Sequence, residues 1–180
     1  MDIYQIWTTY NKQWSRYEIS AFVGVLILVC IAMAVYVHRK KLSIIQAVAI
    51  LALVVFLGIV FGSTVFTRTG TIRQYELEPF WSWRDIIRYH DWTLLKENLL
   101  NCILLLPAGV LFPIIANHKI KWYQALAVGI LVSAIIEFSQ LIFMRGLFEW
   151  DDMIHNGLGC MIGNLFANIF GLNEKVNFTF

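Results

Sequence analysis

The stretch "SAIIEFSQ", residues 133–140, places side chains that can do chemistry inside an apolar run. Ser133, Glu137 and Gln140 are spaced four and three residues apart, so a helix presents them on one face. A carboxyl group within a membrane helix costs about 3 kcal/mol at the helix centre and less toward the interface. Such a residue usually faces the interior of a bundle and marks a functional site.

Two other groups of polar side chains repeat this pattern. Asp152 and Asn156 are four residues apart in the next apolar run, and Asn98 and Asn101 are three apart at the start of an earlier one. Each pair shares one helix face. Glu137 lies about 9 Å inside the end of its own run, at 1.5 Å per residue. Because all three faces fall at similar depth, we predict one polar pocket that opens outward.

The pocket residues allow either binding or proton transfer. Arg145 is the cation nearest to Glu137 in the sequence and its expected partner. Two carboxylates beside an arginine can hold a polar headgroup, or act on it as acid and base. The alternative is a polar network that only holds helices together. His155 falls off the Asp152 face and is interpreted as a lone interfacial histidine.

Composition indicates the elements that must position these residues. The 180-residue chain is 59% hydrophobic and 14% charged, with mean hydropathy +0.66, whereas soluble domains are about 25% charged. A membrane span needs ~20 apolar residues, and five runs are close to that length. They cover residues 19–37, 42–62, 98–116, 122–143 and 153–172. We therefore predict an all-α, polytopic bundle of five transmembrane helices in a single membrane domain, residues 1–180. The first run is expected to stay as a helix and not to be a cleaved signal peptide.

Small residues and prolines should shape the packing of these helices. Gly159 and Gly163 form a G-x-x-x-G pattern, which lets helices approach closely. Pro107 and Pro113 should kink the third helix. The cysteines lack metal-ligand spacing and are interpreted as small core residues; they are Cys30, Cys102 and Cys160. We predict neither a metal site nor a cofactor.

The short loops predict the orientation of the bundle. "HRKK", residues 38–41, and "NHKIK", residues 117–121, are basic and lack acidic residues, as is typical of cytoplasmic turns. This arrangement places the N-terminus and the long loop 63–97 outside and the C-terminal tail inside.

Loop 63–97 contains a segment rich in aromatic and charged residues. Trp81 and Trp83 are followed within a few positions by Arg84 and Arg88. Tryptophan settles at headgroup depth, and an amphipathic helix can lie flat there. The segment is expected to be an extracytoplasmic interfacial helix, as an aromatic anchor or as a surface for anionic headgroups.

Three elements in order resemble the VanZ-like family of small bacterial integral membrane proteins. They are "ELEPF" (76–80), "NLLNCILLLPAGVLFP" (98–113) and "IEFSQLIFMRGLFEWDDMIHNGLGCMIG" (136–163). The resemblance covers about residues 76–172. It carries the family motif onto six positions, which are Glu137, Gln140, Arg145, Asp152, Asn156 and Gly159. Two positions depart from the usual pattern. The first element usually reads N-L-x-P-F in the family, and here Glu78 stands nearest the position of its Asn-Leu. Trp150 stands where an aliphatic residue is commoner.

The resemblance implies a role at the bacterial cell envelope, in the cytoplasmic membrane. The founding member is associated with low-level resistance to the glycopeptide teicoplanin, and the family supplies no reaction or cofactor to carry over. One hypothesis is a pocket that binds a lipid, a lipid-linked cell-wall precursor or a glycopeptide-type antibiotic. The other is an intramembrane enzyme that acts on a lipid headgroup, with Glu137 and Asp152 as the acid-base pair.

We favour binding, because the sequence has no nucleophile elbow, metal motif or phosphate loop. Membrane lipids are the expected partners, and nothing suggests nucleic acid. The identity of the ligand and the oligomeric state stay open at this level.

Overall fold

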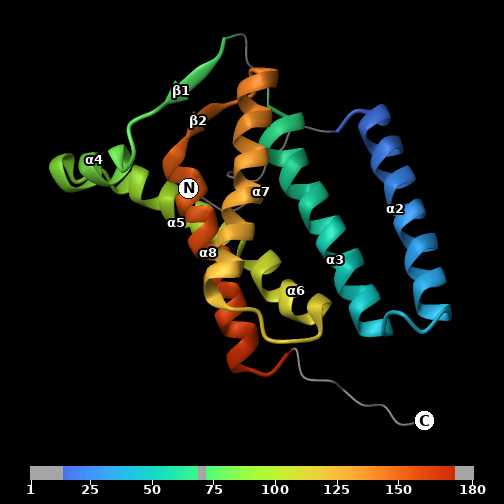
Figure 1. Ribbon diagram of the computed structural model, residues 1–180. Helices are drawn as coiled ribbons and strands as arrows, with labels where there is room; N and C mark the ends of the chain where they lie inside the picture. The colour runs from blue at the N-terminus through green and yellow to red at the C-terminus, as the bar shows by residue number, and fades with distance from the viewer. Residues whose placement is uncertain (1–13, 69–71, 173–180) are drawn as a thin grey trace.

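The computed structural model describes residues 14–68 and 72–172 and is predominantly helical (Figure 1). In chain order, the elements of the first half are α2 (Arg16–His38), α3 (Ile44–Phe61), a π-helical turn η1 (Gly62–Phe66), β1 (Gln74–Glu76) and α4 (Trp81–Tyr89). Those of the second half are α5 (Trp92–Leu104), α6 (Leu106–Ala116), α7 (Trp122–Phe143), β2 (Leu147–Glu149) and α8 (Trp150–Ile169).

Four helical stretches are long and apolar enough to cross a membrane. They are α2, α3 with η1 (Ile44–Phe66), α5 with α6 (Trp92–Ala116), and α7. The predicted all-α membrane bundle is therefore confirmed. The fifth expected segment forms α8, whose polar residues lower its hydropathy, and α8 packs against α5, α6 and α7.

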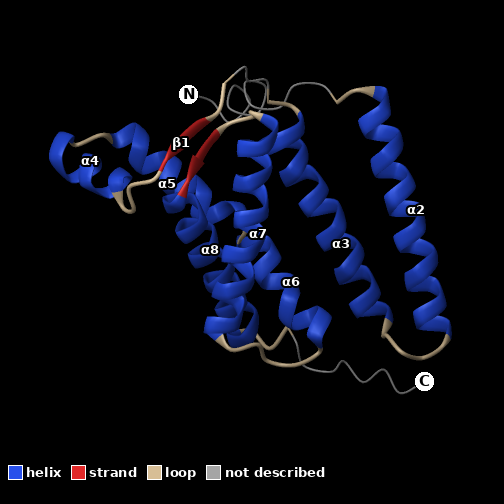
Figure 2. Ribbon diagram, turned by 45° about the horizontal axis from the view of Figure 1, so that its top comes forward, coloured by secondary structure: helices blue, strands red, loops and turns tan. Residues whose placement is uncertain are grey.

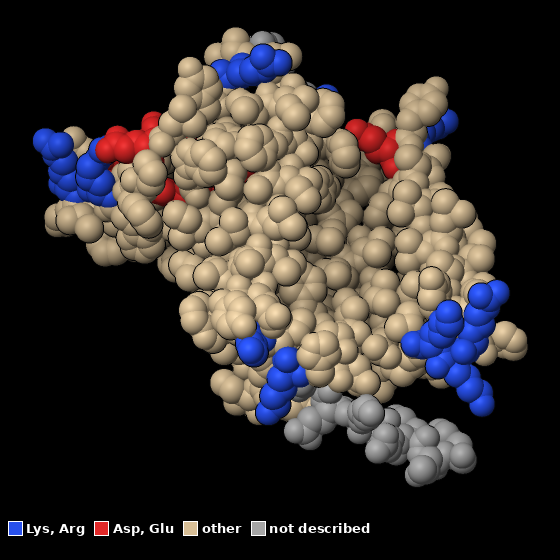
Figure 3. Space-filling model, in the orientation of Figure 1, with Lys and Arg blue, Asp and Glu red and all other residues tan. Residues whose placement is uncertain are grey.

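Charged residues separate the two ends of the bundle. We define the basic end as the two turns at residues 38–41 and 117–121, where the described chain has no Asp or Glu. The opposite, acidic end holds β1, α4, β2 and the first turn of α8, with most of the carboxylates. In Figure 3 the Lys and Arg side chains along the lower edge stand without acidic neighbours. This distribution follows the predicted loop pattern.

The third apolar run forms two helices instead of one. Leu105 leaves helical geometry at φ −101° and ψ 6°, and separates α5 from α6. Pro107 follows in the first turn of α6, where its missing N–H costs little. Pro113 lies inside α6 and is buried. The predicted kink is thus a full break, which turns α6 relative to α5.

A short parallel strand pair at the acidic end was not expected from the sequence. Gln74, Tyr75 and Glu76 align with Leu147, Phe148 and Glu149, respectively. Figure 2 shows the two strands side by side where α7 ends and α8 begins. Three-residue strands carry too little alternation to be recognised in a sequence, so their pairing depends on the helices that bring them together.

Helix α8 approaches the backbones of α5 and α6 through glycines. A Cβ atom at Gly159 would lie 1.7 Å from the carbonyl oxygen of Cys102, and one at Gly163 would lie 2.1 Å from that of Leu106. In return, a Cβ at Gly109 of α6 would lie 2.0 Å from the carbonyl oxygen of Cys160. No side chain fits between these backbones at Gly159 and Gly163, and this is the close approach that a G-x-x-x-G pattern allows.

Replacing Gly159 by Ala should lower the thermal stability of the detergent-solubilised protein. The added methyl group meets a backbone carbonyl that cannot rotate away, and such overpacking costs about 1–3 kcal/mol. Gly24→Ala is the matched control, because nothing lies within 4 Å of a Cβ at Gly24 of α2. A helical Gly→Ala change at an open position stabilises by roughly 0.5–1 kcal/mol. Equal melting temperatures for both variants would contradict the close approach.

Candidate functional site

A buried polar cluster lies between α7 and α8 near the acidic end. Glu137 of α7 is only 2% exposed, and Gln140 and Ser133 on the same face are also buried. On α8, Asn156 donates its amide N–H to the Ser133 hydroxyl at 2.8 Å. The Ser133 hydroxyl in turn faces the backbone carbonyl of Asp152 at 3.5 Å. The predicted faces of the two helices therefore meet.

Glu137 and Gln140 connect α7 to two other elements. The Glu137 carboxylate accepts a hydrogen bond from the backbone N–H of Glu149, in β2, at 3.1 Å. Gln140 donates its side-chain N–H to the carbonyl of Thr64, in η1, at 3.1 Å. Both α7 side chains thus hold backbone groups of neighbouring segments.

Helix α5 joins the cluster through Asn101. Its amide N–H donates to the Asp152 carboxylate at 2.5 Å. The structure thereby brings together most of the predicted pocket residues. We use the name polar centre for the set Asn101, Ser133, Glu137, Gln140, Glu149, Asp152 and Asn156.

Arg145 does not fill its expected role as the partner of Glu137. Within residues 14–68 and 72–172, the structure shows no ion pair between the two. Instead, one guanidinium nitrogen of Arg145 donates to the carbonyls of Phe66, at 2.9 Å, and Arg68, at 2.5 Å. Arg145 thus caps the carbonyl end of η1, where backbone acceptors lack helical partners.

Arg68 is the cation that acts on the polar centre, and the sequence analysis missed it. It lies close enough to Glu137 and Asp152 to attract both electrostatically. Its guanidinium would lie 3.2 Å from a Cβ at Gly146, which places it beside the α7–β2 turn. In the sequence, Arg68 is one of several arginines of a mixed-charge loop, so only the fold distinguishes it.

Glu149 is a second residue that the sequence analysis did not assign to the site. Partial burial, followed by the negative charges of Asp152, Asp151, Glu97 and Glu76 in that order, together raise the pKa of its carboxyl to about 8. Glu149 is therefore mostly protonated at neutral pH. One of its carboxyl oxygens is buried without a hydrogen-bond partner among the described residues.

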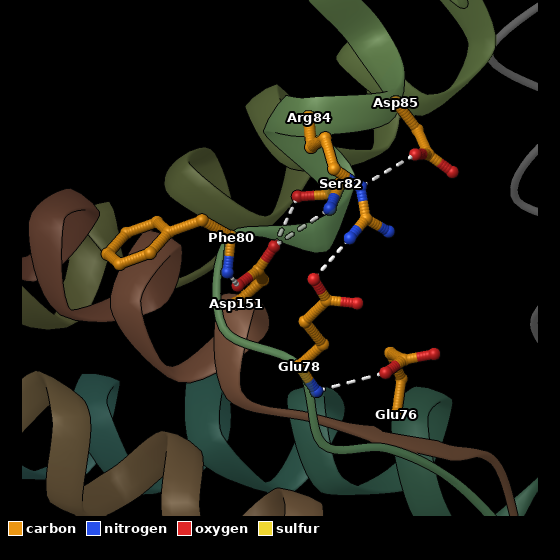
Figure 4. Close-up of polar contacts among 7 residues, drawn as sticks. All are labelled: Glu76, Glu78, Phe80, Ser82, Arg84, Asp85 and Asp151. Atoms are coloured by element: carbon orange, nitrogen blue, oxygen red, sulfur yellow. Dashed lines mark hydrogen bonds and ion pairs between the residues drawn. The ribbon is translucent and has the colours of Figure 1, made fainter. Parts of the chain in front are cut away.

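Asp151, beside Asp152, holds helix α4 (Figure 4). Its buried carboxylate accepts the backbone N–H of Phe80 at 2.5 Å and both the backbone N–H, at 3.2 Å, and the hydroxyl, at 2.5 Å, of Ser82. Phe80 itself offers no side-chain cap, so Asp151 supplies the cap from 71 residues away. Asn98 donates to the Ser82 hydroxyl at 3.0 Å. Asn98 thus belongs to this α4 contact and not, as expected, to the polar centre.

The interpretation of His155 as a lone interfacial histidine is wrong. His155 is 2% exposed, and its Nε2 accepts the indole N–H of Trp83 at 2.8 Å. The helix that covers it, α4, lies far away in the sequence, so the helical face of His155 alone could not show its burial.

The other predicted headgroup residues of α4 have mixed surroundings. Arg84 pairs with Glu78 and with Asp85, the latter at 3.3 Å. The Arg88 guanidinium lies 5.5 Å from the centre of the Tyr89 ring. Trp81 is half-buried, while Ile87, Tyr89 and Trp92 are among the most exposed apolar side chains of the segment. The apolar surface of α4 is therefore carried by residues beyond the two predicted tryptophans.

The described part of the chain has no group of three or more His, Cys, Asp or Glu side chains that could hold a metal ion. Its cysteines are free, and only Cys160 is fully buried. Cys30 is exposed on α2, so its interpretation as a core residue is wrong.

Comparison with known proteins places this architecture in a family. The family model described as VanZ/LLP1 matches residues 43–171. The match starts earlier than the motifs at 76–172 suggested, and it includes α3. No curated protein and no solved structure matches the chain. Because the family model covers well over half of the 180 residues, this membrane protein belongs to the VanZ/LLP1 family.

Proposed function

We propose that this protein acts in the bacterial cell envelope, where its polar centre faces outward and binds a lipid, a lipid-linked cell-wall precursor or a glycopeptide-type antibiotic. The observation that carries the proposal is the convergence of α5, α7, α8 and β2 on buried carboxyl and amide groups. The VanZ family is linked to teicoplanin resistance in general. A contribution to low-level resistance of the teicoplanin type follows from that link.

The arrangement of the polar centre supports binding. Asn101, Glu149 and Asp152 are partly exposed, whereas Glu137 and Asn156 lie buried behind them. A ligand can therefore meet the first group directly while the second fixes its position. Interhelical hydrogen bonds in membranes contribute only about 0.6 kcal/mol each on average. Stability from such hydrogen bonds alone is too small to explain why several acidic groups are buried together.

An intramembrane enzyme acting on a lipid headgroup is the second candidate. It is favoured by one observation: Glu137 and Asp152 lie close enough to repel each other electrostatically. Two carboxyl groups in unequal surroundings can divide the roles of acid and base. Release of a labelled headgroup by the purified protein, lost in both Glu137→Gln and Asp152→Asn, would favour this candidate over binding.

The outward orientation predicts which end is reached from outside intact cells. Single cysteines at positions 73 and 119, in a background without the native cysteines, sit at the acidic and the basic end. An impermeant maleimide should label the cysteine at 73 and not the one at 119, because short basic loops stay cytoplasmic. The reverse pattern would invert the topology and contradict an outward polar centre.

Glu137→Gln should abolish the contribution to teicoplanin resistance while the protein stays folded. The amide keeps hydrogen bonding but removes the ionisable group, so the melting temperature should stay near that of wild type. Antibiotic susceptibility and melting of the detergent-solubilised protein are measured together, for Glu137→Gln and Asp152→Asn.

Glu18→Gln is the matched control, since Glu18 lies at the same end and a glutamine preserves its capping box with Ser15. If stability and resistance fall in step in both test variants, the polar centre is only scaffold. Full resistance in both would equally contradict the proposal.

Helix α4 is proposed to lie in the outer interface, with membrane lipids around its exposed face. Phe80, Trp83 and Ile87 are exposed and fall near one side of the helix, beside Arg84 and Arg88. A protein that keeps Trp83 as its only tryptophan should be quenched most by lipids brominated near the headgroup. Strongest quenching by deep bromines, or none, would contradict this placement.

A further inference from the structure

The polar centre carries more negative than positive groups. The four charges that act most strongly on the Glu149 carboxyl are all negative. They come from α8, α5 and β1 and are Asp152, Asp151, Glu97 and Glu76. From α7, Glu137 interacts with Glu149 as well. Carboxyl groups on α5, α7, α8 and β1 therefore all act electrostatically on Glu149.

The nearby arginines already have other partners. Arg145 donates to the backbone carbonyls at the end of η1. Arg84 pairs with Glu78 and Asp85 on α4. Arg68 attracts Glu137 and Asp152. The single guanidinium of Arg68 therefore attracts two carboxyl groups, and Glu149 is a third carboxyl group in the polar centre.

Two buried acceptor atoms also indicate that a donor is missing. Asn156 is 2% exposed, and its amide N–H is fixed on Ser133, which leaves its oxygen without a partner among the described residues. Asn156 lies one turn along α8 from Asp152, on the same face. One oxygen of Glu149 is likewise buried and without a partner. Buried acceptors of this kind require a donor.

Given the proposed binding function, we infer that the polar centre recognises a primary ammonium group, carried by a lipid headgroup or by a water-soluble amine. An ammonium supplies three N–H donors and a positive charge, which match the carboxyl and amide oxygens. A phosphate group would meet these same carboxylates as a like charge. A bound metal ion fits less well, since the described residues offer no three-ligand group.

Ammonium binding should depend on pH. In the free protein the pKa of Glu149 is about 8, so most molecules carry a neutral carboxyl at pH 6.5 and an ionised one at pH 8.5. A bound cation favours the ionised form, and binding below pH 8 therefore releases a proton. Affinity should rise between these pH values, because an alkylammonium with a pKa of about 10 stays charged throughout.

Native mass spectrometry of the purified full-length chain in detergent tests the inference. The probes are phosphatidylethanolamine, phosphatidylcholine and phosphatidylglycerol with identical acyl chains. We expect phosphatidylethanolamine to bind about tenfold more tightly than the other two, as a charge-assisted hydrogen bond implies. The preference should disappear in Glu149→Gln and Asp152→Asn and persist in Glu18→Gln. It should also be larger at pH 8.5 than at pH 6.5.

Acyl-free glycerophosphoethanolamine separates the two sources of the ammonium group. Binding as tight as that of the lipid assigns the site to soluble amines, and much weaker binding assigns it to lipid headgroups; either result supports the inference. Equal binding of the three lipids overturns it but leaves the proposed function standing. Displacement of phosphatidylethanolamine by Mg²⁺ alone would also overturn it.

Binding of no lipid and no amine would overturn the inference, and loss of resistance in Glu137→Gln would then still support the proposed function through another ligand. If the variants do not fold, the headgroup comparison and the pH series on the wild-type chain decide. A preference that is absent at both pH values overturns the inference.

Discussion

The close contact of α8 with the backbones of α5 and α6 is the constraint on which the rest of the structure depends. Gly109, Gly159 and Gly163 remove the side chains that would otherwise separate these helices. In a bilayer, buried polar groups must find partners within the protein. Asp151, Asp152 and the amide N–H of Asn156 find theirs because the glycine contacts fix α8 between α5, α6 and α7. A small shift of α8 would leave its aspartates and asparagines without them.

The first turn of α8 divides two neighbouring carboxylates between different tasks. Asp151 caps α4, while Asp152 receives the amide of Asn101 and lies in the polar centre. Consecutive residues on a helix point about 100° apart, so one turn serves both helix α4 and the bundle interior. The placement of α4 and the geometry of the polar centre therefore depend on the same short segment, which also begins directly after β2.

The sequence predicted what local spacing determines. Helical periodicity placed Ser133, Glu137 and Gln140 on one face, and the hydrophobic runs located the helices within a few residues. The prediction from sequence failed where segments that are distant in the chain meet. The β1–β2 pair, the contact of His155 with Trp83 and the role of Arg68 all join residues at least 69 positions apart. No local pattern encodes such a contact.

The family motif residues of this chain have different structural roles, which their burial and hydrogen bonds distinguish. Arg145 and Gly159 stabilise backbone arrangements, and Gln140 holds the carbonyl of Thr64. Asp152 remains partly exposed and faces the carboxyl groups around it. Glu149, which lies outside the six motif positions, has the more unusual environment, since the four charges that act most strongly on its carboxyl are negative. The groups with an unusual environment therefore leave out motif positions such as Arg145 and Gly159, and they include Glu149, which the motif omits.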